Sequence, residues 1–313
     1  MAVGKGMTFK MVARLVTKDF EKGIGKLKRQ LSIFGNFLKG AFTIGSITMF
    51  GKAMVEASME FEDAMARVKS VCNATTEEMQ MMTAEARKMG ETTRYTATEA
   101  AKAMENLVRN GLSAQQATKA LSSVLQLAQA NAIGLDEAAV ILTNTLNMFN
   151  LSVNEAARVN DVLSSTAANT ATNVAELYDA LANAAPVASV LGFNIEEVNA
   201  ALGALAQRGV KGADAGTQLR MAFVKLTDPA ILKKLKDYNI NIDEQTIKAD
   251  GLAGTFRKLY NAQLSMSQLV DIFSQKGAAG MANLIMAYQQ FERVLNITEN
   301  SMGTTERMFG QSM

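Results

Sequence analysis

The feature that most constrains this chain is a short polar pattern that recurs along its middle. A Ser, Thr or Asn is followed three residues later by Glu or Gln, the capping-box spacing that satisfies backbone amides at a helix start. We interpret six such pairs as helix starts: Thr75 with Glu78, Thr96 with Glu99, Ser113 with Gln116, Ser152 with Glu155, Asn173 with Glu176, and Asn194 with Glu197. Each pair predicts a helix N-terminus, and together they predict helices of roughly 10 to 18 residues.

Apolar residues after these caps recur at the spacing of one helix face, as in Ala100, Ala103, Met104 and Leu107. Hydrophobic staples accompany three of the caps: Leu112 with Ala117, Leu151 with Ala156, and Phe193 with Val198. Gly and Asn end the segments, so the chain is expected to fold back repeatedly. The sequence therefore predicts a mainly α fold, an Ala-rich multi-helix bundle over residues 56–228, in which Pro186 breaks or restarts a helix.

The flanking regions differ from this bundle. Residues 1–40 carry nine basic and two acidic side chains, a net charge of +7, and residues 1–55 form a basic arm punctuated by Gly. Alternation over residues 9–16 weakly indicates a strand before a helical region at residues 27–37. The uncharged run Ala41–Gly51 is too short to cross a bilayer, so a packed hairpin or an interfacial segment is expected.

The third region, residues 229–313, is expected to be a small helical or α+β appendage. Residues 238–243 and 245–251 have the composition of very short strands or extended pieces. Helices are predicted from about Leu252 and over residues 284–295.

Composition excludes most catalytic chemistry. The 313 residues contain no His and a single Cys, Cys72, so His-based triads, two-His metal sites, internal disulfides and thiolate zinc sites are absent. The run Gly45–Lys52 spaces its glycines one residue too far apart for a phosphate loop. We therefore predict no catalytic, cofactor-binding or metal-binding residues and no enzyme activity.

Two pairs of adjacent acids leave a glycosidase as an alternative. Glu77 with Glu78 and Glu196 with Glu197 both fall in the first turn of a predicted helix, where acids complement the helix dipole. The structural interpretation is favoured for both pairs. Residues 96–200 hold four basic and ten acidic side chains, which argues against specific nucleic-acid binding.

A Gly-rich stretch over residues 207–220 is the one surface motif that helix packing does not explain. Its glycines permit positive φ or close backbone approach, and its cations could hold an anion or a partner carboxylate. The candidate interaction loop consists of Gly209, Lys211, Gly212, Gly216, Thr217 and Arg220. A simple Gly-rich connection between helices is an equal alternative. The 20 Met suit either gap-filling in helix cores, which we favour, or adaptable contacts.

The chain resembles the core region of phage tail tape measure proteins. Seven segments in this order carry the resemblance, which spans about residues 55–300: residues 61–68, 96–104, 110–117 and 207–220, then the Asp228-Pro229 break, the extended piece at residues 240–242, and residues 273–280. It implies a virion tail component, made in the bacterial host cytoplasm, that serves tail assembly, tail length determination and genome delivery. The implied partners are tail tube subunits, tail assembly chaperones and tail tip or baseplate proteins, with self-association as a further option.

Tape measure proteins usually continue into a long helical rod, whereas this sequence stops at Met313. Even a continuous helix of this length would span only about 470 Å, so length measurement by this chain alone is not expected. An amino-terminal portion, a split-gene product and a module working beside another chain all remain open. A different class of function is a membrane-active protein that inserts residues 31–55 into a bilayer during genome delivery.

Overall fold

The computed structural model describes residues 44–311, with side chains from residue 55 onward except that of Lys276. Every regular element in this range is a helix, which confirms the mainly α prediction. The chain divides into two compact units, Met1–Glu60 and Phe61–Met313, and the division falls within one helix. The predicted strand at residues 9–16 and helical region at residues 27–37 lie outside the described residues.

The described helices follow one another with short connections. They are α2 (Ile44–Val71), α3 (Thr76–Thr92), α4 (Ala97–Arg109), α5 (Ala114–Asn131), α6 (Leu135–Met148), the 3₁₀ turn η2 (Val153–Glu155), α7 (Ala156–Asn169), α8 (Val174–Leu191), α9 (Ile195–Gln207), α10 (Gly212–Leu226), α11 (Pro229–Asp237), α12 (Glu244–Asn261), α13 (Met266–Met286), α14 (Tyr288–Glu299) and α15 (Thr304–Gln311).

Four of the six predicted capping boxes are complete. Both reciprocal hydrogen bonds form at Thr75, Thr96, Ser113 and Asn194. Asn173 accepts from the backbone amide of Glu176, but the Glu176 carboxylate accepts from the Thr172 hydroxyl instead of returning to the cap. Short-range sequence therefore fixes where most helices of this region begin.

The prediction at Ser152 is wrong, because the chain makes a 3₁₀ turn before α7 and Ser152 forms no side-chain cap hydrogen bond. This turn moves the start of α7 past Glu155. The Glu155 carboxylate is then one turn from Arg158 and accepts from its Nη1 at 2.7 Å. An ion pair replaces the expected capping box.

Pro186 does not end a helix, contrary to the prediction, and lies inside α8. Proline removes one backbone donor and so weakens the turn that precedes it. Buried alanines on both sides of it, at 184, 185 and 188, pack α8 against its neighbours. Tertiary packing outweighs the local cost, as is common for helices in globular proteins.

Residues 245–250 are helical and not extended, and Gly251 is a non-helical break inside α12, so that part of the α+β alternative is wrong. Asp243 and Thr246 form a reciprocal cap that starts α12, a pairing the sequence pattern of Glu or Gln did not include. The preceding residues 240–243 are non-helical, and Ile240 and Ile242 are buried. The expected extended piece at residues 238–243 is thus a turn at residues 238–239 followed by a non-helical link, in which the Ile242 amide donates to the Ile240 carbonyl, and it forms no strand.

The uncharged run at residues 41–51 was expected to form a hairpin or an interfacial segment. From Ile44 onward it is the first part of α2, so the hairpin is wrong. Gly45 and Gly51 cost about 1 kcal/mol each relative to Ala, which a helix of 28 residues tolerates. Within the described residues, no helix is long and apolar enough to span a bilayer.

The core of the second unit is centred on α9. This helix is buried on every side from Ile195 to Ala206, and it contacts α7, α8, α10, α12, α13 and α14. A helix buried all round must be apolar or have its polar groups paired. Because Glu196 and Glu197 lie in this buried helix, their carboxylates need hydrogen-bond or ion-pair partners.

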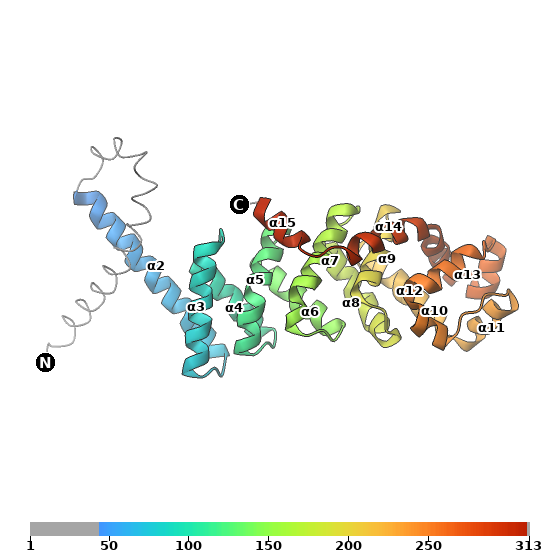
Figure 1. Cartoon of the computed structure of the whole chain (residues 1–313), viewed down its shortest axis with the longest axis horizontal. Helices are drawn as coiled ribbons and strands as arrows, with labels where there is room; N and C mark the ends of the chain where they lie inside the picture. Colours follow the sequence, from blue (N-terminus) through green and yellow to red (C-terminus); the bar gives the residue numbers. More distant parts are fainter. Residues whose placement is uncertain (1–43, 312–313) are drawn as a thin grey trace. The chain divides into compact units, whose positions relative to one another are not determined.

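The last two helices return along earlier ones. Figure 1 shows α14 and α15, in red, running back beside α9 and α7, and α15 also contacts α5. The return crosses the boundary expected at residue 229, since α14 packs on α9 and α13 packs on α10. That domain boundary stays a prediction from composition.

Candidate interaction surface

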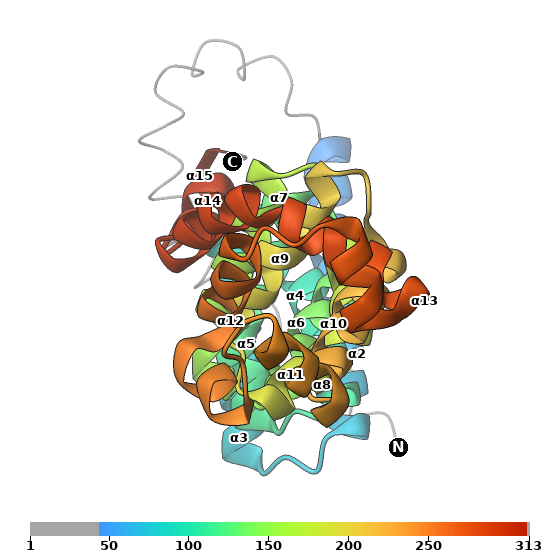
Figure 2. The same cartoon turned by 90° about the vertical axis from the view of Figure 1, so that its right-hand side faces the viewer.

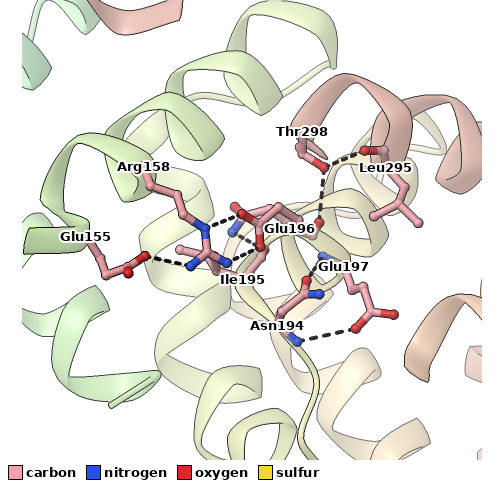
Figure 3. A network of polar contacts seen from close by, with 9 residues as sticks. Glu155, Arg158, Asn194, Ile195, Glu196, Glu197, Leu295 and Thr298 are labelled. Carbon is pink, nitrogen blue, oxygen red and sulfur yellow. Dashed lines mark hydrogen bonds and ion pairs between the residues drawn. The ribbon is translucent and has the colours of Figure 1, made fainter. Parts of the chain in front are cut away.

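The adjacent acids Glu196 and Glu197 lie in the first turn of α9 and are both buried. Glu196 binds Arg158 of α7 through two parallel hydrogen bonds, Nε to Oε1 at 2.7 Å and Nη2 to Oε2 at 2.8 Å. Figure 3 shows the guanidinium held between Glu196 and Glu155. This fork geometry ties α7 to α9 and orients both planar groups.

The electrostatics of the cluster follow from this geometry. Hydrogen bonding to Glu196, and then to Glu155, raises the pKa of Arg158 above its already high ordinary value. The Glu196 side chain is 10% exposed, whereas that of Arg158 is 44% exposed. The nearly buried carboxylate therefore depends on a half-exposed cation for its compensation.

Glu197 links α9 to α12. Its Oε2 accepts from the backbone amide of Asn194 in the capping box, while Oε1 accepts from the amides of Leu252 and Ala253 at 2.9 and 3.2 Å. Gly251 breaks α12 with φ 64°, and the helix restarts under this carboxylate. A Cβ at Gly251 would lie 2.5 Å from Glu197 Oε1, so only glycine fits.

The Asp161 carboxylate of α7 caps the start of α15 in the same way. Its Oδ2 accepts from the amide of Gly303 at 2.7 Å and its Oδ1 from the amide of Thr305 at 2.9 Å. The Thr305 hydroxyl also bonds the hydroxyl of Ser164 on α7. A buried carboxylate at a helix N-terminus satisfies free amides and complements the helix dipole.

These contacts support the structural interpretation of the acid pairs. Glu78 completes the capping box of α3, and Glu196 binds Arg158. Glu197 completes the capping box of α9 and also caps the part of α12 that restarts after Gly251. Each of these carboxylates is already committed to holding helices together.

The candidate interaction loop is not a single loop. Gly209 ends α9 with φ 85°, Lys211 is the residue before α10, and Gly212 begins α10 with φ 55°. Gly216, Thr217 and Arg220 all lie within α10. Only residues 208–211 form the connection that the glycine content indicated.

Gly216 permits close packing of two helix backbones, one of the two roles expected for the glycines of this stretch. A Cβ there would lie 2.1 Å from the backbone oxygen of Ala180, so α8 and α10 touch backbone to backbone. Lys211 pairs with Glu176 of α8 at 3.9 Å. Arg220 is exposed and nine residues further along, about 13 Å up the helix, so Lys211 and Arg220 do not form one anion site.

Thr217 leads to a surface feature that the sequence did not reveal. α10 and α13 are neighbours, as Figure 2 shows, and a groove of about 300 Å³ lies between them. We call it the α10–α13 groove; its lining includes Thr217, Met221, Lys225, Gly277, Gly280 and Asn283. A Cβ at Gly280 would meet nothing within 4 Å, so this wall is open.

The two helices that form the groove carry exposed apolar side chains, of which Met221 lines the groove itself. Met221 and Val224 of α10 are 45% and 52% exposed, and Met286 at the end of α13 is 53% exposed. Arg208 lies with its guanidinium 3.9 Å from the Met286 sulfur. In the sequence, the helical spacing of Thr217, Met221 and Val224 is the one sign of this exposed face. The same spacing is found on buried helix faces, so the sequence alone does not show which of the two it is.

The fold and these contacts define an all-helical scaffold whose buried polar groups join helices. Residues 83–284, nearly two thirds of the chain, match the family model of phage-related minor tail proteins. The chain belongs to this family.

Curated relatives are tape measure proteins. The tape measure protein of Pneumococcus phage Dp-1 is 29% identical over 281 residues, covering 86% of this chain and 24% of that protein. The probable tape measure protein of Escherichia phage P2 is 32% identical over 184 residues, covering 58% and 23%. The chain thus spans about a quarter of the length of these relatives. No solved structure matches it.

Proposed function

We propose that this chain works in the phage tail as a folded scaffold that contributes to tail assembly, and through it to tail length determination and genome delivery. The family match over residues 83–284 carries this proposal. The names of the relatives support a link to the tape measure. Because these relatives are much longer than the segment they share with this chain, we expect the part that sets tail length to lie mostly outside that segment.

The mode of action we propose is adhesion between protein surfaces without catalysis. Buried carboxylates in the second unit bind arginine or cap helices, as Glu196, Glu197 and Asp161 do. The partners we propose are tail tube subunits, tail assembly chaperones, and tail tip or baseplate proteins. The surface we propose for one such contact includes Thr217 and Arg220 beside the α10–α13 groove.

The folded state also shapes what the segment contributes to tail length. As one straight helix, residues 83–284 would measure about 300 Å at 1.5 Å per residue. The capped helices fold back on one another, so the folded segment is much shorter than this extended helix. We therefore expect it to nucleate or anchor assembly.

The test is complementation of a phage that lacks the gene. An in-frame deletion of residues 83–284 should abolish tails, and electron microscopy with mass spectrometry of purified particles should find the intact chain in wild-type virions. The deletion of residues 1–43 is a matched comparison that spares the described helices. Normal tails without the segment, or tails shorter by the full extended length, would contradict a scaffold role.

A further inference from the structure

One face of α10 carries opposite charges at its two ends. Asp214 lies in the first turn and Lys225 in the last turn. They are 11 residues apart, which is three turns of an α-helix, so both lie on the same face. We propose that this face binds the same face of a second copy of the chain, with the two α10 helices antiparallel. Each Asp214 then pairs with Lys225 of the other copy.

The residues between these charges are uncharged and follow the same side of the helix. Thr217 and Gln218 come three and four residues after Asp214, and Met221 comes seven residues after it. We call this set the α10 stripe: Asp214, Thr217, Gln218, Met221 and Lys225. Four of its members line the α10–α13 groove, and the exposed Asp214 extends the stripe by one turn.

Both charges of the stripe lack a partner of opposite charge in the same molecule. Among the residues that the structure describes, Asp214 and Lys225 form no ion pair, whereas Lys211 at the start of the helix pairs with Glu176. Lys225 is half-buried, and its Cε would lie 3.7 Å from a Cβ at Gly277. A half-buried ammonium without a carboxylate can gain one from another molecule.

The order of the charges selects both the partner and its direction. In an antiparallel pair of α10 helices centred between residues 219 and 220, Asp214 lies opposite Lys225 and Gln218 lies opposite Met221. A parallel pair would instead place like charges together. Because the two charges are only about 16 Å apart along the helix, a crossing angle near 20° keeps both ends within reach.

The second wall of the groove leaves room for a partner helix. Gly277 and Gly280 of α13 present no side chain there, and a Cβ at Gly280 would meet nothing within 4 Å. Met221, which is 45% exposed, can adjust to the surface of the partner because the Met side chain is flexible and polarizable. The same surface is used by both copies, so the contact closes as a two-fold dimer.

This self-contact goes beyond the tail role proposed above, and it is measured on the purified chain. The test uses the 313-residue chain and sedimentation velocity from low micromolar to sub-millimolar concentration. Wild type should dimerise. Asp214→Lys and, separately, Lys225→Glu should each weaken dimerisation on the order of 100-fold, because like charges then face each other at both ends.

Restoring the charge match should restore the dimer. The variant with both changes, Asp214→Lys with Lys225→Glu, should dimerise like wild type, and so should an equimolar mixture of the two single variants. An acid in the first turn and a base in the last turn also complement the dipole of a helix within one chain. The variant with both changes should therefore unfold more easily than wild type as a dilute monomer, although its dimerisation is restored.

A matched control is Glu137→Lys with Lys119→Glu, which reverses an exposed acid in the first turn of α6 and an exposed base of α5. It should leave dimerisation unchanged. Zero-length carbodiimide coupling of mixed isotope-labelled and unlabelled chains should join Asp214 of one copy to Lys225 of another. A wild-type monomer throughout, single reversals without effect, no dimer from the variant with both changes, or loss of the dimer on deletion of residues 1–40 would overturn the proposal.

Discussion

The helices α3–α9 and the helices α10–α15 are held in different ways. In the first set, cap side chains lie three residues from the amides they bind, as at Thr75, Thr96, Ser113 and Asn194. In the second set, two helix starts depend on carboxylates from the first: Glu197 at Leu252 and Asp161 at Thr305, 55 and 144 residues away. Local caps start helices in both sets, at Asp243 and Ser265 in the second, but the second set in addition has these two helix starts that depend on carboxylates of the first.

The largest expected effect is at the seam between the two sets. Gly216→Ala places a Cβ 2.1 Å from the Ala180 backbone oxygen and must push α8 and α10 apart. We expect a loss of about 3 kcal/mol in the free energy of unfolding, measured by urea denaturation. Gly310→Ala is the control, because its Cβ would meet nothing within 4 Å. Equal free energies of unfolding for the two variants would show that α8 and α10 can move apart without loss of stability.

The next effect lies within the first set. Arg158→Ala leaves the Glu196 carboxylate buried without its cation, and we expect a loss of about 2 kcal/mol, below the value for a fully buried pair because Arg158 is half-exposed. Urea denaturation measures the loss. Lys88→Ala, which breaks the exposed pair with Glu85, should cost less than about 0.5 kcal/mol. Indistinguishable losses would mean that the cluster is an ordinary surface pair.

A smaller and more local effect is expected at α15. Asp161→Asn keeps one acceptor oxygen and loses the charge, so one of the bonds to Gly303 and Thr305 is weakened. We expect α15 to open more readily by about 1 kcal/mol, seen as faster amide exchange confined to residues 304–311. Ser70→Ala on α2 is a control outside this contact. Faster exchange throughout α3–α9 would contradict local opening.

The smallest effect concerns a cap that the second set supplies for itself. Hydrogen bonding to Thr246 holds the pKa of the exposed Asp243 carboxylate below its ordinary value of 3.8. Its contribution to stability is therefore fully present above pH 3.8 and is lost as pH falls through the lower folded-state value. NMR titration of the Asp243 carboxyl should show a midpoint below 3.8; a midpoint above it would contradict the cap. Asp243→Asn should remove that titration.

Caps whose two residues lie within four positions of each other can be predicted from the sequence. The pair Ser265 with Gln268 has the same pattern and starts α13, but it is not among the six predicted caps. Asp243 with Thr246 uses a residue type outside the pattern. Gly216 was correctly expected to allow close backbone approach, but its placement in a loop was wrong.

The remaining features depend on distant residues. Gly251 does not reveal that Glu197 lies against it, because the two are brought together only after α9 and α12 pack. Pro186 stays in a helix because buried alanines around it have partners on other helices. The α10–α13 groove likewise joins residues 217–225 to residues 277–283. A single sequence gives no spacing rule for such pairs.

The most direct test of this account is native-state hydrogen exchange on Asp161→Asn combined with Glu197→Gln. Each change weakens a carboxylate that α7 or α9 provides to the later helices. We expect protection to fall in α15 and in α12 after Gly251, while α4–α8 keep theirs. Equal loss of protection across both sets, or no loss in either segment, would contradict it.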